Sequence, residues 1–453
     1  MRPASLLLSA VAALALVPVA RAETTFPATL AGHAMIPAFT LLTPPADAPA
    51  DAFVSGKFTG PARNHVPGSV MGTTGGQHGN RETGIALPFE GQPFQGLSGF
   101  AMTPAAGGSI YSLTDNGFGA KNNSADAMLF LHRLMPDFAT GAVNVAETIY
   151  LRDPAMVVPF RIAYEGTESR YLTGADFDPE SIQVIGETIW IGEEFGPYLI
   201  SATLDGRITG VFPTMIDGVE ARSPDHPALR VPAVAGTDFT VTRSSGYEGM
   251  ALQPGTGLLW AMLEKPILNP EGTNEGSFLR VLAFDPSNGA WTGDSFRFAL
   301  AEGATAIGDF NFIDETRALV IERDNGEGDP SLRCAGDPMP DCFPNPAVLK
   351  RVVLIDTASI DAEGFVRRIG HVDRMNIADP DGVARIANAA AEGTMDGRYT
   401  FPFFTIENVR AVDATTIMVG VDNNLPFSSG RALDAAADNE IVLLSVPELL
   451  AAE

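Results

Sequence analysis

The chain has 453 residues, of which 45% are hydrophobic and 19% charged, and it contains 46 glycines and 34 prolines. This is a turn-rich globular composition with enough apolar residues for a sizeable core. The formal net charge is −26, with 29 Lys and Arg against 55 Asp and Glu. Because nucleic-acid binding depends on clustered lysine and arginine, this charge excludes a nucleic-acid-binding protein.

The N-terminus has the features of an export signal. Arg2 precedes an apolar run over residues 6–19, and Ala20-Arg21-Ala22 fits a signal-peptidase site. The run is shorter than the roughly 20 residues that a transmembrane helix needs, and no second candidate span follows. We therefore expect a signal peptide at residues 1–22 and one mature domain at residues 23–453. The protein should be periplasmic or secreted, and not embedded in a membrane.

Five segments of the chain repeat one pattern, in which a polar residue opens an apolar run that closes on an acidic residue. The opening residues are separated by 82, 68, 61 and 98 positions, which is too long for a helical-hairpin solenoid and suits a four-stranded unit. The opening residues are Ser98, Glu180, Glu248, Asp309 and Glu407, and the segments are residues 96–117, 177–196, 246–266, 307–326 and 405–424.

A second pair of short apolar strands follows most of these segments. Turn-forming dipeptides such as Asp205-Gly206 and Asn288-Gly289 lie between them, as expected for antiparallel hairpins. Four antiparallel strands per repeat predict the blades of an all-β propeller. We favour six blades, one of them degenerate, and leave five open. The last unit lacks a strand, which residues 52–58 could supply, so that N- and C-terminal strands close the ring.

Two cysteines, Cys334 and Cys342, lie in one polar loop. In an exported protein the expected state is a disulfide that closes this small loop. A zinc site would need further Cys or His nearby, and the loop has no histidine.

The acidic residues of the five segments form the main functional signal. In a propeller the innermost strands line a central channel, so residues at equivalent positions of successive blades converge on one mouth of it. Crowded carboxylates repel one another unless a cation neutralises them. Oxygen-rich clusters select Ca²⁺, and Mg²⁺ less readily. The expected metal ligands are Asp115, Glu180, Glu193, Glu194, Glu248, Glu264, Asp309, Glu322, Asp324, Glu407 and Asp422.

A purely structural ring of salt bridges is the alternative to a metal site. Lys121, Lys265, Arg323 and Arg410 lie within or beside the five segments and could neutralise the acids. Three of these cations, Lys121, Arg323 and Arg410, are also candidates for binding an anionic substrate.

Several motifs occur in a fixed order that resembles a known family. The motifs QGLSGF, LTDNGFGAKNNSADAM, DFDPESI, WIGEEFGPYL, GYEGMAL, ENVRAVD and GVDNN are similar to those of the phytase-like exported proteins described as "esterase-like activity of phytase family". The resemblance spans about residues 55–446. It implies, through kinship with calcium-dependent β-propeller phytases, a propeller with bound calcium that hydrolyses phosphate or other esters. It also implies that the acidic residues within the motifs are metal ligands.

Two other hydrolase chemistries find little support. No G-x-S-x-G nucleophile elbow is present, because Gly96-Leu97-Ser98-Gly99 has the wrong spacing. Residues 77–83, QHGNRET, resemble the signature of histidine acid phosphatases. However, Gln77 and Thr83 replace two of its defining residues and no His-Asp dipeptide occurs in the chain.

The sequence thus predicts a monomeric exported hydrolase that uses Ca²⁺ to cleave a small anionic ester. A bound cation would activate the attacking water and reverse the local negative potential. The catalytic candidates are Glu180, Glu248, Asp309 and Glu407. Two alternatives stay open: a non-catalytic propeller that binds an envelope protein or carbohydrate, and a lactonase-like propeller. A single acidic metal site would favour the lactonase, and several clustered metals would favour phosphoester chemistry.

Overall fold

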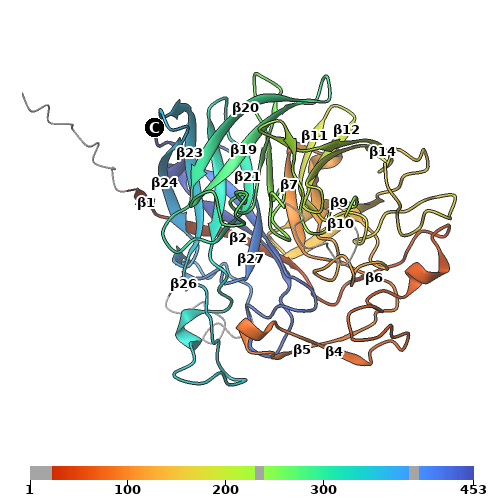
Figure 1. Cartoon of the computed structure of the whole chain (residues 1–453). Coiled ribbons are helices and arrows are strands. Elements are labelled where there is room, and N and C mark those ends of the chain that lie inside the picture. Colours follow the sequence, from red (N-terminus) through yellow and green to blue (C-terminus); the bar gives the residue numbers. More distant parts are fainter. Residues whose placement is uncertain (1–22, 230–238, 387–396) are drawn as a thin grey trace, which may run out of the picture.

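The computed structural model describes residues 23–229, 239–386 and 397–453, and strands dominate it (Figure 1). The predicted signal peptide lies outside these residues. The helical segments of the described chain are four short 3-10 helices and the four-residue helix α1, so the predicted all-β class is confirmed. None of them is long and apolar enough to cross a membrane. The segments are η1 (Ala50–Phe53), η2 (Gly76–His78), η3 (Ala106–Gly108), η4 (Pro330–Leu332) and α1 (Pro447–Leu450).

Most strands belong to five groups of four antiparallel strands, called units here and numbered in chain order. The first and fifth units lie in one larger sheet, joined by a parallel bridge between Ala142 and Met35 of their outer strands. The first unit comprises β7 (Leu97–Pro104), β8 (Ile110–Thr114), β9 (Phe130–Asp137) and β10 (Ala142–Tyr150). The second comprises β11 (Pro179–Ile185), β12 (Thr188–Glu193), β13 (Tyr198–Thr203) and β14 (Ile208–Pro213). The third comprises β17 (Gly249–Leu252), β18 (Leu259–Met262), β19 (Phe278–Asp285) and β20 (Ala290–Ala299).

The fourth unit comprises β21 (Ala306–Phe312), β22 (Arg317–Arg323), β23 (Lys350–Ile360) and β24 (Val366–Asp373), with β1 (Thr24–Phe26) added at its outer edge. The fifth comprises β27 (Thr405–Ala411), β28 (Thr416–Asp422), β29 (Asn439–Ser445) and β2 (Thr29–Ile36). The remaining strands lie outside these units: β3 (Leu41–Leu42), β4 (Val70–Thr73), β5 (Glu82–Leu87), β6 (Gln92–Pro93), β15 (Met215–Ile216), β16 (Val219–Glu220), β25 (Ile377–Ala378) and β26 (Arg398–Tyr399).

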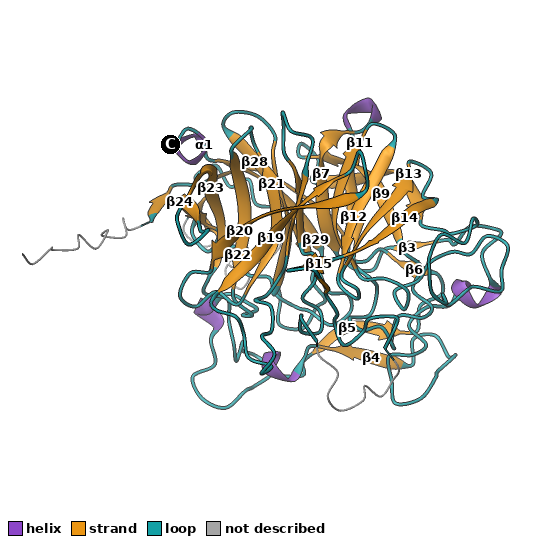
Figure 2. Cartoon of the chain, turned by 45° about the horizontal axis from the view of Figure 1, so that its top comes forward, coloured by secondary structure: helices purple, strands orange, loops and turns teal. Residues whose placement is uncertain are grey.

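The units contact one another through the first strand of each. Strand β7 contacts β11, β11 contacts β17, β17 contacts β21, β21 contacts β27, and β27 contacts β7 again. This cyclic order of neighbours is that of a propeller-like ring. Figure 2 shows the strands gathered in one part of the molecule, with many long loops and the β4–β5 hairpin on one side of them.

The core lies between neighbouring units. One apolar cluster joins the fourth and fifth units, with residues such as Leu319, Val352 and Ile417 fully buried. Another joins the first and second units, around Leu131 and Ile191. Because each unit buries both faces against its neighbours, its strands read as nearly continuous apolar runs.

The ends of the chain meet in the fifth unit, as the sequence predicted. Strand β2 pairs antiparallel with β29 from Thr29 opposite Ser445 to Ile36 opposite Asn439. The strand expected at residues 52–58 does not form. Residues 50–53 are helix η1, and Gly56 has a left-handed φ of +84° that ends any extended run. The segment at residues 29–36 takes its place.

Candidate functional site

The first strand of each unit is called its inner strand here. The five inner strands carry equivalent residues at one end. The pairing register shifts by an extra residue near the start of β7, β11, β21 and β27, between Leu97 and Gly99 in the first case and between Pro179 and Ser181 in the second. Such β-bulges re-aim a side chain and commonly lie next to functional sites. The pairing places one residue of each inner strand at an equivalent position near the start of the strand, called its entry residue here. These residues are Ser98, Glu180, Glu248, Gly308 and Glu407.

The second strand of each unit ends at a matching position. The residues at or just after this end are Asp115, Glu194, Glu264, Arg323 and Asp422. The first, second, third and fifth units thus supply an acid, and the fourth unit supplies a cation. All five residues line one cavity of about 230 Å³. The equivalent ends of the units therefore converge on a single site, as the repeat pattern predicted.

Seven of the eleven predicted metal ligands line this cavity, together with one acid that was not predicted. The predicted ones are Asp115, Glu180, Glu194, Glu248, Glu264, Glu407 and Asp422, and the additional one is Asp178. Two cations, Lys265 and Arg323, and the polar residues Asn116, Ser244, Asn325, Thr405 and Asn424 complete the polar lining.

Three of these acids are close enough to share one cation. Carboxylate oxygens of Asp115, Asp178 and Glu180 all lie within 4.8 Å of one another. Asp178 Oδ1 and Glu194 Oε1 are buried and have no hydrogen-bond partner among the described residues. A buried carboxylate oxygen without a donor is costly unless a cation completes its environment. An all-oxygen set of this kind fits Ca²⁺.

Burial and mutual repulsion disfavour ionisation of these acids in the absence of a cation. Burial raises the pKa of Asp115 to about 6 and that of Asp422 to about 8, where the charge of Asp115 adds to the effect. Burial also raises the pKa of Glu180 well above its usual value, and the charges of Asp115 and Asp178 raise it further. Burial, and then the charges of neighbouring carboxylates, also raise the pKa of Asp178, Glu194, Glu248 and Glu407.

The two cations of the cavity belong to the third and fourth units and compensate the acids unevenly. Arg323 Nη2 lies 2.7 Å from Glu264 Oε1, 3.6 Å from Glu248 Oε1 and 3.9 Å from Glu407 Oε1. Lys265 Nζ lies 2.6 Å from Glu264 Oε2. The acids of the first and second units, Asp115, Asp178 and Glu180, have no such ion pair among the described residues. The site therefore combines an uncompensated acidic group with a cationic pair.

Two of the remaining predicted ligands serve the backbone instead of the cavity. Glu193 accepts hydrogen bonds from the backbone N–H groups of Phe195, Gly196 and Tyr198. Asp309 accepts from the N–H groups of Phe310 and Val409, and so joins β21 to β27. The alignment of Asp309 with Glu180 is one residue off, because Gly308 holds the equivalent entry position. A shift of one residue turns a side chain to the other face of a strand.

The last two predicted ligands pair with cations outside the cavity. Glu322 Oε2 accepts a 2.9 Å bond from Arg368. Asp324 lies 3.1 Å from Lys350 Nζ and also accepts from the N–H groups of Gly326, Val348 and Leu349. Both carboxylates are fully engaged by protein donors.

Of the predicted substrate-binding residues, only Arg323 lines the acidic cavity. Lys121 lines a separate pocket, where its Nζ donates to the carbonyl of Asp225. Arg410 donates to the carbonyls of Ala101 and Met102, further along the inner strands. Also on the inner strands, Gln183 Nε2 donates to Asn311 Oδ1 at 2.7 Å. This bond joins the inner strands β11 and β21.

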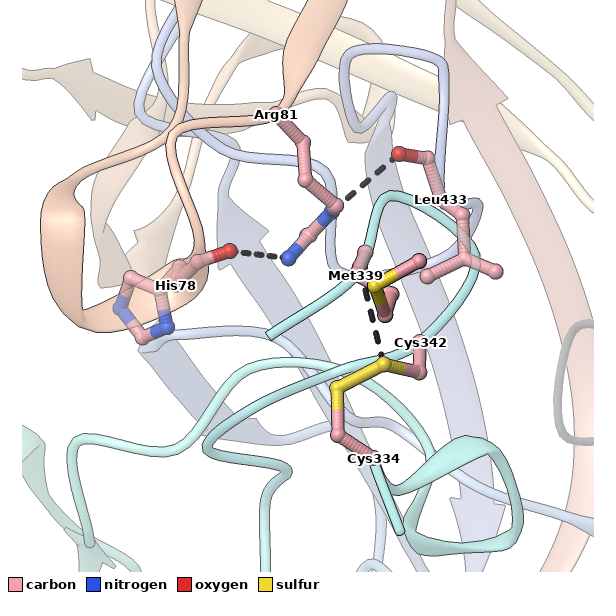
Figure 3. Close-up of a disulfide and its surroundings, with 6 residues drawn as sticks. All are labelled: His78, Arg81, Cys334, Met339, Cys342 and Leu433. Atoms are coloured by element: carbon pink, nitrogen blue, oxygen red, sulfur yellow. Dashed lines mark hydrogen bonds between the residues drawn. A yellow bond between two sulfur atoms is a disulfide. The ribbon is translucent and has the colours of Figure 1, made fainter. Parts of the chain in front are cut away.

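The residues of the segment that resembles the histidine-phosphatase signature have structural contacts outside the cavity. His78 is buried, 5.1 Å from the ring of Phe404, and does not line the cavity. Arg81 is buried too, and its Nη2 donates to Glu327 at 2.9 Å and to Ser429. Figure 3 shows both residues close to the disulfide between Cys334 and Cys342, which confirms the predicted pairing.

Asp178 is the site residue that sequence reasoning missed. The dipeptide Asp178-Pro179 is typical of a turn, and this pattern alone does not predict a metal ligand. A usable signal was present, since Asp178 and Glu180 are two residues apart, the spacing of side chains on one face of a strand.

The chain belongs to the phytase-like family, described as esterase-like activity of phytase, and the match covers residues 92–425. No curated protein sequence matches it. Among solved structures, the chain is similar to an endo-arabinanase from Bacillus licheniformis at 12% identity, covering 77% of this chain and 91% of the other with a TM-score of 0.35. It is also similar to a putative 6-phosphogluconolactonase from Bacteroides fragilis at 14% identity, covering 78% and 89% with a TM-score of 0.28.

Proposed function

We propose that this protein is a calcium-dependent hydrolase of small phosphate or carboxylic esters that acts at the acidic cavity. The observation that carries the proposal is the group of Asp115, Asp178 and Glu180, whose oxygens lie within 4.8 Å of one another and are not paired with a described cation. Membership of the phytase-like family supports hydrolysis as the reaction.

Different residues of the cavity would bind the cation and the substrate. Asp115, Asp178 and Glu180 would hold the cation, and Glu194 and Asp422, which line the same cavity, would be the further oxygen ligands. When bound, Ca²⁺ would polarise the ester and lower the pKa of an attacking water. Arg323 and Lys265 would orient an anionic group of the substrate, because both present positive charge to the same cavity.

A buried carboxylate of the cavity would also accept the proton of the attacking water. Glu248 and Glu407 suit this role because burial raises the pKa of each well above its usual value. A raised pKa brings a carboxyl group closer to the operating pH of a general base. Both carboxylates lie near Arg323, at 3.6 and 3.9 Å.

For the architecture, we propose a ring of five blades, one for each of the five units. The cyclic contacts of the inner strands support this number. We also propose export through residues 1–22 and action as a monomer, both on the sequence features given above.

A second candidate function is lactone hydrolysis. Within the described residues one group of acids is close enough to hold a metal, and a single metal site was the feature expected of a lactonase-like propeller. Phosphoester chemistry would gain support from several cations bound in the same cavity.

The test is metal analysis of the purified mature protein, followed by hydrolysis assays. Phytate, simple phosphomonoesters, carboxylic esters and lactones would be assayed with calcium and with chelator. Glu180→Gln should lose hydrolysis and bound calcium together, whereas the exposed Glu302→Gln should retain both. Full activity in chelator after verified metal removal would contradict the proposal.

A further inference from the structure

Arg374 follows strand β24 and is the largest fully buried side chain of the described residues. Its Nε, Nη1 and Nη2 atoms have no hydrogen-bond acceptor within the described chain. A guanidinium group stays charged in proteins, and an uncompensated buried charge is strongly destabilising. Burial lowers the pKa of Arg374 to about 9, against a usual value above 12. The position therefore calls for a negative partner.

Arg374 ends a row of three cations that crosses the fourth unit. Arg323 in β22 is the direct pairing partner of Lys350 in β23. The N–H of Arg374 donates to the carbonyl of Lys350 at 2.8 Å, so Arg374 continues the row beyond β24. Like charges on adjacent strands repel one another. The charge of Arg323 indeed contributes to lowering the pKa of both Lys350 and Arg374.

The first two cations of the row are compensated by protein groups. Arg323 faces the acids of the cavity, with Glu264 at 2.7 Å. Lys350 Nζ lies 3.1 Å from Asp324 Oδ1 and donates to the carbonyls of Asp324 and Phe404. These contacts use the three donors of the ammonium group. The charge of Asp373, next to Arg374, raises the pKa of Arg374, but Asp373 accepts from the N–H of Met375 and makes no ion pair with Arg374 among the described residues.

We propose that Arg374 binds a small monovalent anion of the size of chloride, which serves as the counter-ion of this row between the fourth and fifth units. The surroundings favour this class of ligand. Val352 and Val372, on the strands of the row, belong to the apolar cluster between these units, and so does Phe401, whose N–H donates to the carbonyl of Arg374. A single positive group in apolar surroundings can compensate one negative charge, so a monovalent anion fits and the further charge of a multivalent oxyanion would stay uncompensated.

The site is distinct from the acidic cavity and does not depend on the proposed hydrolase function. Arg374 and Lys350 do not line the cavity, whereas Arg323 does. The anion would act through the row, because it offsets part of the repulsion that Arg323 experiences from Lys350 and Arg374.

Thermal unfolding of the mature protein tests the proposal. The melting temperature would be measured in chloride, bromide, nitrate and gluconate at equal ionic strength, with chelator present throughout to remove any contribution of cation binding. The three small anions at ten times their dissociation constant should raise the melting temperature by about 1 to 2 °C over gluconate. Crystals grown in bromide should show an anomalous peak beside the Arg374 guanidinium.

A pair of variants separates this site from general salt effects. Arg374→Met should remove the difference between chloride and gluconate and the bromide peak. Arg351→Met, which replaces a half-buried arginine of the same sheet outside the row, should retain both. The same melting temperature in all four anions, or a bromide map without a peak at Arg374, would overturn the proposal. A larger shift in phosphate or sulfate than in chloride would overturn the assignment to a monovalent anion.

Discussion

Asp178 offers a direct test of the candidate metal centre at the scale of a single residue. One of its carboxylate oxygens is buried without a partner among the described residues, and Asp178 belongs to the group with Asp115 and Glu180. Asp178→Asn should weaken calcium binding by about tenfold or more, because a neutral amide replaces a charged ligand. Isothermal titration calorimetry measures this affinity.

Asp309→Asn is the matched control for that experiment. Asp309 is equally buried but bonds to the backbone of Phe310 and Val409 outside the cavity. This variant should lower the melting temperature and leave the calcium affinity unchanged. If instead Asp309→Asn removed calcium and Asp178→Asn did not, the placement of the metal centre would be wrong.

Protons should compete with the cation for these carboxylates. The pKa of Asp115 is raised to about 6 and that of Asp422 to about 8, so both acids take up protons as the pH falls from 8 to 5. Calcium must displace these protons, and its affinity should therefore rise with pH over this range. Calorimetry in buffers of different ionisation enthalpy would detect the released protons. An affinity independent of pH between 5 and 8 would contradict this prediction.

The same groups set the pH dependence of stability in the cation-free protein. Their pKa is higher in the folded state than in the unfolded chain, where carboxyl groups titrate near 4. The unfolded state thus loses its protons first, and the free energy of unfolding should fall as the pH rises from about 4 to 8. Thermal melts in chelator should show this decline, and saturating calcium should reduce it.

At the scale of elements, the five repeated segments identified all five inner strands. Apolar runs between polar ends predicted β7, β11, β17, β21 and β27, and the hairpin turns predicted most of their partners. The exact alignment could not be predicted, since β-bulges insert residues that periodicity does not reveal. This is why Asp309 was placed at the site and Gly308 was not. Asp178 was missed for a related reason: a local Asp-Pro turn pattern says nothing of what the turn faces.

Gly308 illustrates how tightly the inner strands pack. A Cβ atom at this position would lie 1.9 Å from the carbonyl oxygen of Ile406 in β27. Gly308→Ala should therefore force β21 and β27 apart and lower the free energy of unfolding by about 1 to 3 kcal/mol or more. Chemical denaturation measures the loss. Gly166→Ala, where a Cβ meets nothing within 4 Å, is the control and should stay close to the parent protein.

At the scale of the whole molecule, the residues that stabilise the fold are separate from the residues that form the candidate site. Each unit buries apolar residues against its neighbours, and the acids gather only where the inner strands begin. A net charge of −26 opposes the approach of an anionic ester, so local compensation by a cation is a condition of the proposed function. The sequence predicted this convergence because equivalent positions of a cyclic repeat must meet near its axis.

Closure of the ring by the N-terminal strand gives the last prediction. Strand β2 supplies the outer strand of the fifth unit and buries Leu30, Ala34 and Ile36 against it. A chain that begins at Ala38 would leave β29 as an unpaired edge, which favours aggregation. It should melt at a temperature lower by several degrees and lose soluble yield, because burial of each such side chain contributes about 1 to 3 kcal/mol.

A chain that begins at Pro27 is the control for this deletion. It lacks β1, which adds three mostly exposed residues to the edge of β24, and Glu23, which pairs with Arg368 and His371. It should lose much less stability than the chain that begins at Ala38. A synthetic peptide of residues 27–37 should raise the melting temperature of the shorter chain, since the peptide can add itself to β29 as the missing strand. Equal melting temperatures of the two shortened chains, or no response to the peptide, would show that β2 does not close the ring in solution.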